Sequence, residues 1–550
     1  MNVIRAIAWF LLCGALISCG GGASVASGEG VGTGGTGISM GTVTGFGSVV
    51  IDGKSYNSAS PSYYTQSSLS DAAPALPTDV NLGDQVQVDL DAQGNPSSVI
   101  IAPDLVGAVA AADTTGFSVN GVRVQFNNQL KAGPLTYFSG LQGPGSVQNG
   151  MQVAVSGAYG LNASGAPWVM ATLIERLPDA NTILRTSGIV SGLDNSAQSF
   201  QIGNLTIHFN PATLVLPKPT ALANGVFVKV WSNQSLSNGG ATLSANIIRA
   251  RSLLGRTGSV QLSGLVAQLS GSHFQISGIG IDASASNLTS AEAALTGGQY
   301  VTVRGQIDSS SGSVVANAID SYASQPVQTA IQGTITGYTG VGAFFVRGVP
   351  VDASTAQITF GSGVSTLADG MYVELVGTVG ASNSAVIVAS TLTVIGPQAP
   401  NGKSVIYRGL VRQFVSASQP FVLVRRVNGV DVLESVTLAS NVSYGNGSAS
   451  QLANNVGIEL EATKNASGLT GYSVNFIGSG PGSSGGGVQP VLVRGRVDAL
   501  SATTLYVAGL AIQLNGVIAQ GGALVGGARV EVWISATGGM LLAQSITIKN

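Results

Sequence analysis

The chain has 550 residues, of which 77 are glycine, and 44% of its residues are hydrophobic. This length allows several domains, and the glycines do not follow the repeating period of collagen. Charged residues make up only 9% and the formal net charge is −2. These values exclude a disordered polyelectrolyte and disfavour a surface that neutralises nucleic-acid phosphates.

Residues 1–18 have the features of a targeting segment. Arg5 provides a positive charge near the start, and residues 6–17 form an apolar run shorter than the ~20 residues of a membrane-spanning helix. The run ends in Leu-Ile-Ser-Cys-Gly at 16–20, which resembles a bacterial lipobox. We therefore expect a lipoprotein signal peptide at 1–18 and a lipid, palmitate included, on Cys19. The alternative is a plain secretory signal with an incidental cysteine.

Residues 19–38 are rich in glycine, serine and threonine, which predicts a flexible tether. Gly20 follows Cys19, where an aspartate would favour retention in the inner membrane of enteric-type bacteria. For a Gram-negative host we therefore expect the outer membrane. The predicted location is the cell envelope, with the protein attached to a membrane through its N-terminal lipid.

One sequence unit recurs seven times after the tether, most clearly at residues 331–392. It opens with Gly-x-(Val/Ile) at Gly333, and an aromatic-led segment from Phe345 then turns at Gly348. After a variable stretch, Gly370 precedes a strand that alternates apolar and polar residues, and a closing strand follows. Because alternate strand residues face opposite sides, each unit predicts short strands with one buried face. Five strands are expected, with the longest connection between the third and the fourth.

The same glycines recur in the other copies. The opening glycines are Gly41, Gly107, Gly188, Gly264, Gly333, Gly409 and Gly495, and the later ones are Gly83, Gly150, Gly225, Gly298, Gly370 and Gly527. In the sixth copy Asn455 replaces the later glycine, as expected if the turn requires a left-handed residue.

These copies define repeats 1 to 7. They span residues 39–102, 105–177, 184–253, 258–323, 328–396, 405–478 and 490–550, with a Gly/Ser linker at 479–489. We predict an all-β chain, a tandem array of about seven small five-stranded OB-like β-barrel domains. Closure of a barrel removes exposed strand edges, and an OB-type barrel has its long connection after the third strand. Small β-sandwiches remain the alternative.

The pattern of glycines and apolar residues resembles domain of unknown function 5666, which occurs in tandem in bacterial envelope proteins. The resemblance covers most of the chain after residue 39 and implies an envelope β-domain. It implies no known activity, so no functional residue is carried over from it.

The residues that carry chemistry are few and scattered. His208 and His273 fall in different repeats, so neither is expected to bind a metal, which needs several converging ligands. Asp89 and Asp91 resemble the start of a calcium loop, but Ile100 stands where the bidentate acid is required, which favours a hairpin turn. The one basic cluster, at 425–426, lies in a predicted hairpin. We therefore expect no catalytic residue, cofactor, metal or nucleic-acid partner.

Trp231 and Trp533 follow the same strand in their repeats and are candidate ligand contacts, because aromatic rings can stack on sugars. Packing between neighbouring domains is the favoured alternative. The sequence therefore predicts a non-enzymatic, lipid-anchored envelope protein that presents repeated β-domains as a structural or interaction surface to a protein or glycan partner. The alternative function is recognition of polysaccharide or peptidoglycan.

Overall fold

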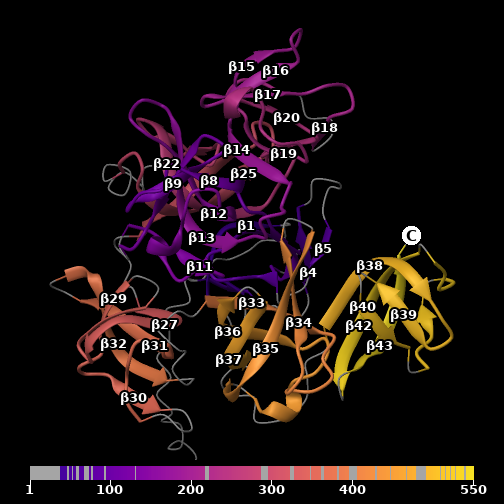
Figure 1. Cartoon of the computed structure of the whole chain (residues 1–550). Coiled ribbons are helices and arrows are strands. Elements are labelled where there is room, and N and C mark those ends of the chain that lie inside the picture. The colour runs from indigo at the N-terminus through magenta and orange to yellow at the C-terminus, as the bar shows by residue number, and fades with distance from the viewer. Residues whose placement is uncertain are drawn as a thin grey trace, which may run out of the picture. The chain divides into compact units, whose positions relative to one another are not determined.

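The computed structural model shows a chain built from strands (Figure 1). It describes residues 37–549 except 46–48, 53, 57–60, 67–72, 76–78, 92–93, 130–131, 217–221, 286–294, 323–327, 347–348, 361–364, 381–382, 395–404, 428–429, 446, 466, 478–490, 508–509, 515, 521, 527 and 538–539. Within these residues no α-helix is present, and so none could cross a membrane. Residues 34–550 form a unit separate from residues 1–33, and every contact given below lies within the former.

The strands fall into seven groups that follow the repeats. Repeat 1 has β1 (Ile38–Gly45), β2 (Val49–Ile51), β3 (Lys54–Tyr56), β4 (Ser62–Thr65), β5 (Ala73–Ala75), β6 (Gln85–Leu90) and β7 (Pro96–Ile101). Repeat 2 has β8 (Leu105–Ala110), β9 (Gly116–Val119), β10 (Val122–Phe126), β11 (Tyr137–Ser139), β12 (Gln152–Leu161) and β13 (Pro167–Arg176). Repeat 3 has β14 (Leu184–Ile189), β15 (Ser191–Asp194), β16 (Ser199–Ile202), β17 (Leu205–His208), β18 (Leu214–Leu216), β19 (Phe227–Ser232), β20 (Thr242–Ser244) and β21 (Ile247–Ala250). Repeat 4 has β22 (Ser259–Ser270), β23 (His273–Ile276), β24 (Ile279–Asp282), β25 (Tyr300–Asp308) and β26 (Ser313–Ser321).

The remaining strands belong to the last three repeats. Repeat 5 has β27 (Gln328–Gly340), β28 (Ala343–Val346), β29 (Val349–Asp352), β30 (Gln357–Phe360), β31 (Tyr372–Gly380) and β32 (Asn383–Val394). Repeat 6 has β33 (Val405–Arg412), β34 (Phe421–Val427), β35 (Val430–Gly445), β36 (Gly457–Asn465) and β37 (Gly468–Phe476). Repeat 7 has β38 (Val491–Leu500), β39 (Thr504–Val507), β40 (Leu510–Gln513), β41 (Ala519–Gln520), β42 (Arg529–Thr537) and β43 (Met540–Lys549).

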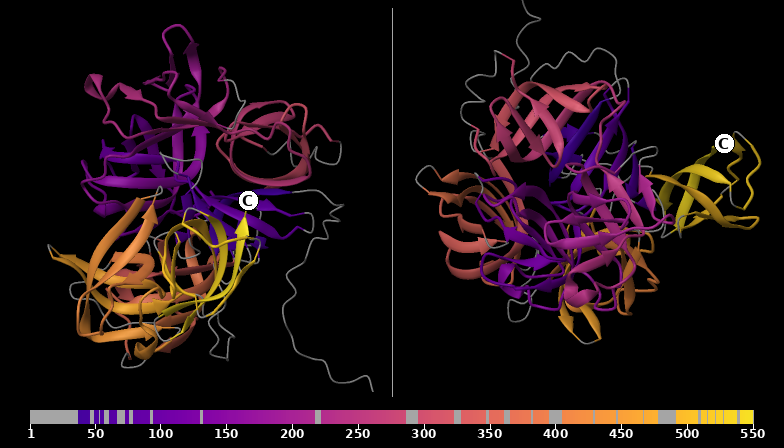
Figure 2. Two further views of the ribbon diagram at one scale, coloured as in Figure 1. Left: turned by 90° about the vertical axis from the view of Figure 1, so that its right-hand side faces the viewer. Right: turned by 90° about the horizontal axis from the view of Figure 1, so that it is seen from above.

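Each group closes, or nearly closes, into a small barrel. In repeat 6 the closed order is β33-β34-β35-β37-β36, so the third strand pairs with the last, and this pairing is parallel. The same order occurs in repeats 2, 4, 5 and 7, where β10–β13, β24–β26, β29–β32 and β40–β43 are the parallel pairs. The barrels of repeats 4 and 7 are seen as rings of strands in the left view of Figure 2. This is the connectivity of an OB-type barrel, and the predicted all-β array of small OB-like barrels is confirmed.

Two repeats depart from the regular barrel. In repeat 3 the first strand is divided into β14 and β15 and the last into β20 and β21, so its two halves belong to different sheets. In repeat 1 the last strand, β7, pairs with β6 and, in parallel, with β4 of the long connection, and the pairings described for the third strand, β3, include β2 but not β7. The long connection after the third strand also has its own structure: in repeats 2, 3, 5 and 7 it carries a short strand that lies parallel to the last strand.

Glycine is required at the two repeated positions for different physical reasons. The later glycine has a positive φ, between 81° and 88°, in repeats 1 to 5, and Asn455 takes its place with a φ of 69°. The expected left-handed turn is therefore confirmed. The opening glycine is required by close approach: a Cβ on Gly264 would lie 2.7 Å from Cγ2 of Ile276, and one on Gly188 would lie 2.4 Å from Cγ2 of Ile202.

In repeats 2 to 6 an aromatic residue near the start of the second strand lies in the core of the barrel. Phe117, Phe200, Phe274 and Phe421 are at most 2% exposed. In repeat 5 this residue is Phe344, which is 1% exposed, whereas Phe345 is 43% exposed. The prediction that Phe345 leads this hairpin was wrong by one residue, because Phe344, and not Phe345, stands two residues before Val346 and four before Gly348, the spacing that Phe117 and Phe274 have in repeats 2 and 4.

Strands of different repeats, both distant and consecutive in sequence, pair with one another. β1 of repeat 1 pairs in parallel with β22 of repeat 4, through Ile38–Met40 and Val260–Leu262, and this joins two barrels into one sheet. β8 of repeat 2 pairs with β14 of repeat 3 at Val106 and Arg185. The N-terminal parts of first strands are thus used to connect repeats.

Candidate functional site

The most distinctive chemistry of the described residues lies at the joints between repeats. Charged residues are scarce in this chain, yet several are almost completely buried: Asp84, Asp104, Glu175, Arg185, Lys229 and Arg425 are each at most 7% exposed. A buried charge is costly unless it is paired and hydrogen-bonded. We therefore considered these joints as the candidate site.

The joint between repeats 2 and 3 is centred on Arg185, which has no exposed surface. Its Nη1 donates to the carbonyl oxygen of Pro103 at 2.6 Å and its Nη2 donates to that of Gln66 at 3.0 Å. Its guanidinium lies 4.3 Å from the ring centre of Trp231, within the range of a cation–π contact. One side chain of repeat 3 thus holds both the join between repeats 1 and 2, at Pro103, and the residue that follows β4 in repeat 1, Gln66.

The hairpin turn of repeat 2 closes the same joint. Asn120 has a φ of 50° and Gly121 a φ of 79°, as a tight type I′ turn requires. The amide of Asn120 donates to the carbonyl oxygen of Val106 at 3.0 Å and to that of Arg185 at 2.8 Å. The turn therefore connects the first strands of two repeats.

A buried ion pair lies beside them. Lys229 Nζ is 2.8 Å from Asp104 Oδ1 and also donates to the carbonyl oxygen of Ala102 at 2.9 Å. The other oxygen of Asp104 accepts from the backbone N–H of Gly157 at 3.1 Å. Burial lowers the pKa of Lys229 to about 8, while Asp104 opposes the shift. Every polar atom of this pair has a partner, so the pair can be buried.

The joint between repeats 1 and 4 uses the hairpin turn of repeat 1. Asp52 Oδ2 accepts from the backbone N–H of Thr42 at 3.0 Å, and its Oδ1 accepts from the hydroxyl of Tyr300 at 2.9 Å. Burial raises the pKa of Asp52 to about 6, although these hydrogen bonds oppose the shift. Asp52 therefore occupies in repeat 1 the turn position that Asn120 occupies in repeat 2.

The joint between repeats 2 and 6 is held by the buried ion pair of Glu175 and Arg425. Arg425 also donates to the carbonyl oxygen of Arg176 at 3.2 Å and lies 4.5 Å from the ring centre of Tyr407. Burial raises the pKa of Glu175, and the guanidinium opposes this shift. Around the pair, Val427 and Val432 of repeat 6 pack with apolar side chains of repeat 2.

Asp84 is the buried acid between repeats 1 and 2. It accepts from the backbone N–H of Asn81 at 2.7 Å and from the hydroxyl of Ser156 at 3.3 Å. Burial raises its pKa to about 8, the hydrogen bonds oppose this, and the nearby Glu175 raises it further. Burial therefore favours the protonated form of Asp84.

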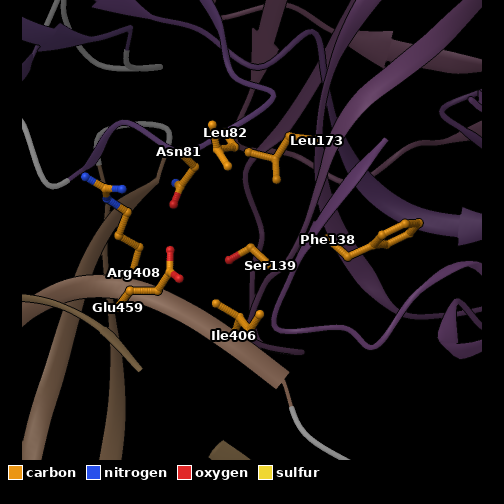
Figure 3. Close-up of a pocket in the computed structure, with 8 residues that line it drawn as sticks. All are labelled: Asn81, Leu82, Phe138, Ser139, Leu173, Ile406, Arg408 and Glu459. Carbon is orange, nitrogen blue, oxygen red and sulfur yellow. The ribbon is translucent and has the colours of Figure 1, made fainter. Parts of the chain in front are cut away.

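A small cavity of about 20 Å³ lies where repeats 1, 2 and 6 meet. Figure 3 shows the side chains of Asn81, Ser139 and Glu459 converging on it, with Leu82, Leu173 and Ile406 beside them. A cavity of this size has room for about one water molecule, since a water needs roughly 10–15 Å³ by this measure. It is a packing feature of the joint and too small for an organic ligand.

The predicted site residues are placed as follows. Cys19 lies outside the described residues. Trp231 has no exposed surface and is covered by Arg185 and by Arg249, whose guanidinium lies 5.2 Å from the ring centre. Both arginines belong to repeat 3, so the ring is covered within its own repeat and a sugar cannot stack on it in this conformation. Packing of Trp231 between neighbouring domains stays a prediction. The backbone of Trp533 lies in β42, but its side chain is outside the described part.

The other candidates from the sequence are also located. His208 and His273 are exposed on separate hairpins, and His273 Nε2 is 3.7 Å from Asp282. In the described ranges no group of three or more His, Cys, Asp and Glu residues could hold a metal ion. Asp89 and Asp91 flank the β6–β7 hairpin, where Asp91 accepts from the backbone N–H of Asn95 at 2.8 Å. The basic pair at 425–426 is used internally, since Arg426 is paired with Asp431 at 2.7 Å.

Sequence reasoning did not find the joint residues. Asp84, Asp104, Arg185 and Lys229 are single charged residues in strands or turns, and a solvated position is the ordinary expectation for each. One signal was present: Arg185 and Lys229 interrupt segments that are otherwise apolar, small or hydroxylic, in a chain with few charges. A charge in such a segment can indicate a buried, paired position.

Comparison with known proteins agrees with the repeated architecture. A family model described as Domain of unknown function (DUF5666) matches residues 187–247, 263–320 and 494–547, which lie in repeats 3, 4 and 7. No curated protein matches the chain. Three regions of the chain are therefore similar to this domain of unknown function, and they lie within an array of small β-barrels.

Proposed function

We propose that this chain is a non-enzymatic, lipid-anchored protein of the bacterial cell envelope that presents its β-barrels as a structural or interaction surface. The observation that carries the proposal is the use of charge at the joints. The buried pairs Asp104–Lys229 and Glu175–Arg425 connect one repeat to another. Buried ion pairs between repeats favour an assembly in which the barrels are held in a defined arrangement.

The anchoring part of the proposal rests on the sequence of residues 1–20. An acyl group on Cys19 would hold the chain at a membrane, and lasting attachment needs more than one acyl chain, as bacterial lipoproteins carry. The Gly-rich residues that follow would give the barrels reach from the membrane. For a Gram-negative host we place the protein at the outer membrane.

The partner class in this proposal is a protein or a glycan, and not a nucleic acid. The pairing of Arg425 and Arg426 with acids of the same chain supports this, because phosphate contacts require free cations on the surface. The burial of Trp231 removes one of the two tryptophans on which the glycan alternative rested.

Replacement of Cys19 by serine tests the anchor. We expect the wild-type protein to incorporate a labelled fatty acid and to sediment with membranes, and Cys19→Ser to lose both properties. Cys13→Ser is the matched control, because Cys13 lies in the segment that is removed, and it should behave as wild type. Unchanged labelling and sedimentation of Cys19→Ser would contradict the proposal.

A further inference from the structure

Asn-Gly pairs recur in the turns of this chain, and in such a pair the asparagine can lose its amide group without an enzyme. The structure describes four of these pairs in full, at 120–121, 149–150, 224–225 and 238–239. In each of them the small glycine lets its backbone nitrogen approach the preceding side chain. Because the local sequence is the same, the surroundings of each pair decide which asparagine reacts.

The pair of Asn120 and Gly121 is protected by burial. Asn120 is only 6% exposed. Its amide nitrogen donates to the carbonyl oxygen of Val106 at 3.0 Å and to that of Arg185 at 2.8 Å. Both N–H groups of the amide are thus in use at the joint between repeats 2 and 3, and the reaction would have to break both bonds.

The pair of Asn149 and Gly150 is exposed, but hydrogen bonds hold both of its reacting groups. The side-chain oxygen of Asn149 accepts from the backbone N–H of Ala112 at 2.9 Å. The backbone N–H of Gly150 donates to the carbonyl oxygen of Val109 at 2.8 Å. The nucleophile and the carbon that it attacks are therefore both fixed in the folded chain.

The pair of Asn224 and Gly225 in repeat 3 is exposed and held in the same way. The side-chain oxygen of Asn224 accepts from the backbone N–H of Leu193 at 3.0 Å, and Gly225 donates to the carbonyl oxygen of Val190 at 2.9 Å. Exposure by itself therefore does not make these two pairs reactive.

The pair of Asn238 and Gly239 lacks this protection. It lies in the turn between β19 and β20, and both residues are exposed. Among the described residues, neither the side chain of Asn238 nor the backbone N–H of Gly239 has a hydrogen-bond partner. The turn is closed by other groups, such as the N–H of Gly240, which donates to the carbonyl oxygen of Ser237 at 3.0 Å. The reacting groups of this pair can therefore meet without unfolding of the barrel.

We propose that Asn238 is a site of spontaneous modification, which converts it to aspartate or isoaspartate in the folded protein. The backbone nitrogen of Gly239 loses its proton to solvent and attacks Cγ of Asn238. The new C–N bond closes a succinimide ring, and the side-chain nitrogen takes up a proton and leaves as ammonia. Water then opens the ring at either carbonyl carbon. One water is consumed and one ammonia is released, and no oxidant or reductant is needed.

The modification places a carboxylate on an exposed turn of repeat 3. Because charged residues make up only 9% of the chain, one new negative charge alters the surface that this repeat presents as the protein ages. The proposal goes beyond the proposed function and depends neither on the lipid anchor nor on a partner. A failure of the Cys19 test would leave it unaffected.

Peptide mapping by mass spectrometry tests the proposal, after incubation of the purified full chain in detergent at mildly alkaline pH. We expect Asn238 to convert about tenfold faster, or more, than the asparagines at 120, 149 and 224, because these react only from locally opened states of the chain. The fraction of each peptide that carries aspartate or isoaspartate, followed over time, gives the four rates.

Two controls separate the effect of the structure from that of the local sequence. In concentrated urea, where the chain is unfolded, the four pairs should react at similar rates. Gly239→Ala should slow the conversion of Asn238, because a side chain hinders the attacking nitrogen, and a Cβ at this position would meet nothing within 4 Å. Conversion of Asn238 no faster than that of Asn149 in the folded chain would overturn the proposal, as would a lead of Asn238 that persists in urea.

Discussion

At the scale of single residues, small changes decide whether barrels can approach one another. Gly83 and Gly150 occupy the same turn in repeats 1 and 2, with φ values of 88° and 86°. A Cβ on Gly83 would lie 2.1 Å from the carbonyl oxygen of Thr172, whereas a Cβ on Gly150 would meet nothing within 4 Å. Both glycines thus allow the turn, and Gly83 also allows a close contact between repeats 1 and 2.

Gly83→Ala should therefore destabilise the protein more than Gly150→Ala. Both substitutions carry the cost of an alanine in the left-handed region, about 1–2 kcal/mol. Gly83→Ala adds an overpacking cost of about 1–3 kcal/mol, because a backbone atom of repeat 2 must move. Urea denaturation of the two variants measures the difference, and equal losses would show that repeats 1 and 2 do not meet at Gly83.

The ion pair of Lys229 and Asp104 gives a second prediction at this scale. Lys229→Met should destabilise the protein by about 3–5 kcal/mol, because it leaves the carboxylate buried without its cation. The double variant Asp104→Leu with Lys229→Met should recover much of this loss, since both buried charges are then removed. Thermal unfolding of the three proteins checks the prediction; a double variant less stable than Lys229→Met would contradict it.

At the scale of elements, the first strand of five barrels, in repeats 2 to 6, carries a bend that the sequence pattern did not reveal. Four residues after the opening glycine, the backbone enters the left-handed region: Ala111 has a φ of 49°, Gln268 of 48° and Gln413 of 54°. Repeats 3 and 5 have Gly192 and Gly337 at this point. In repeat 4 this residue lies in a β-bulge between Ala267 and Ser270, shortly after the first strand has changed from its fourth-strand partner to its second-strand partner, and the bulge bends the strand.

Gln268→Gly should consequently stabilise the protein. Glycine removes the strain of a left-handed glutamine, and after the entropy cost of a glycine we expect a gain of about 0.5–1 kcal/mol. Gln275→Gly is the control in the neighbouring strand β23, where the backbone is extended, and it should be destabilising. Chemical denaturation of both variants provides the test, and a loss of stability in Gln268→Gly would refute the explanation.

At the scale of the whole molecule, buried acids make the joints between repeats sensitive to pH. Asp84 lies between repeats 1 and 2, faces Ser156 and Glu175 of repeat 2, and has Asp79 of its own repeat nearby. Its pKa is raised from 3.8 to about 8, chiefly by burial. Between these values the folded chain keeps a proton that the unfolded chain has lost. The contribution of Asp84 to stability is therefore complete below pH 3.8 and is lost as the pH rises to about 8.

The substitution Asp84→Asn should remove this loss of stability at higher pH. The stability of the variant relative to the wild type should increase as the pH rises from about 4 to about 8, by up to about 1.4 kcal/mol per pH unit, and then stay constant. Asp308→Asn is the control with the opposite sign, because hydrogen bonds from Ser310 and Ser311 lower the pKa of Asp308 to about 2. Its contribution is lost only as the pH falls below about 4, so it should show no trend between pH 4 and pH 8. Urea midpoints of the wild type and both variants, measured across this pH range, test the prediction. A stability difference between Asp84→Asn and the wild type that does not change with pH would contradict the raised pKa of Asp84.

Much of the local architecture could be predicted from the sequence. Alternation predicted the strands, the repeated glycines predicted the turns, and Asn455 was correctly interpreted as a left-handed substitute. The number of strands and the long third connection were enough to predict small OB-like barrels. These features are determined by interactions between residues close in sequence, and for that reason a single sequence contains them.

Only the tertiary structure decided which outer faces contact other repeats. Alternation shows that a strand has two faces, but it does not tell whether the outer face meets water or another barrel. Trp231 and Arg425 were therefore treated as candidate surface residues, whereas both are buried. The pairing of β1 with β22 joins residues more than 200 positions apart. Such contacts depend on the complementarity of two folded surfaces, which exists only after each barrel has formed.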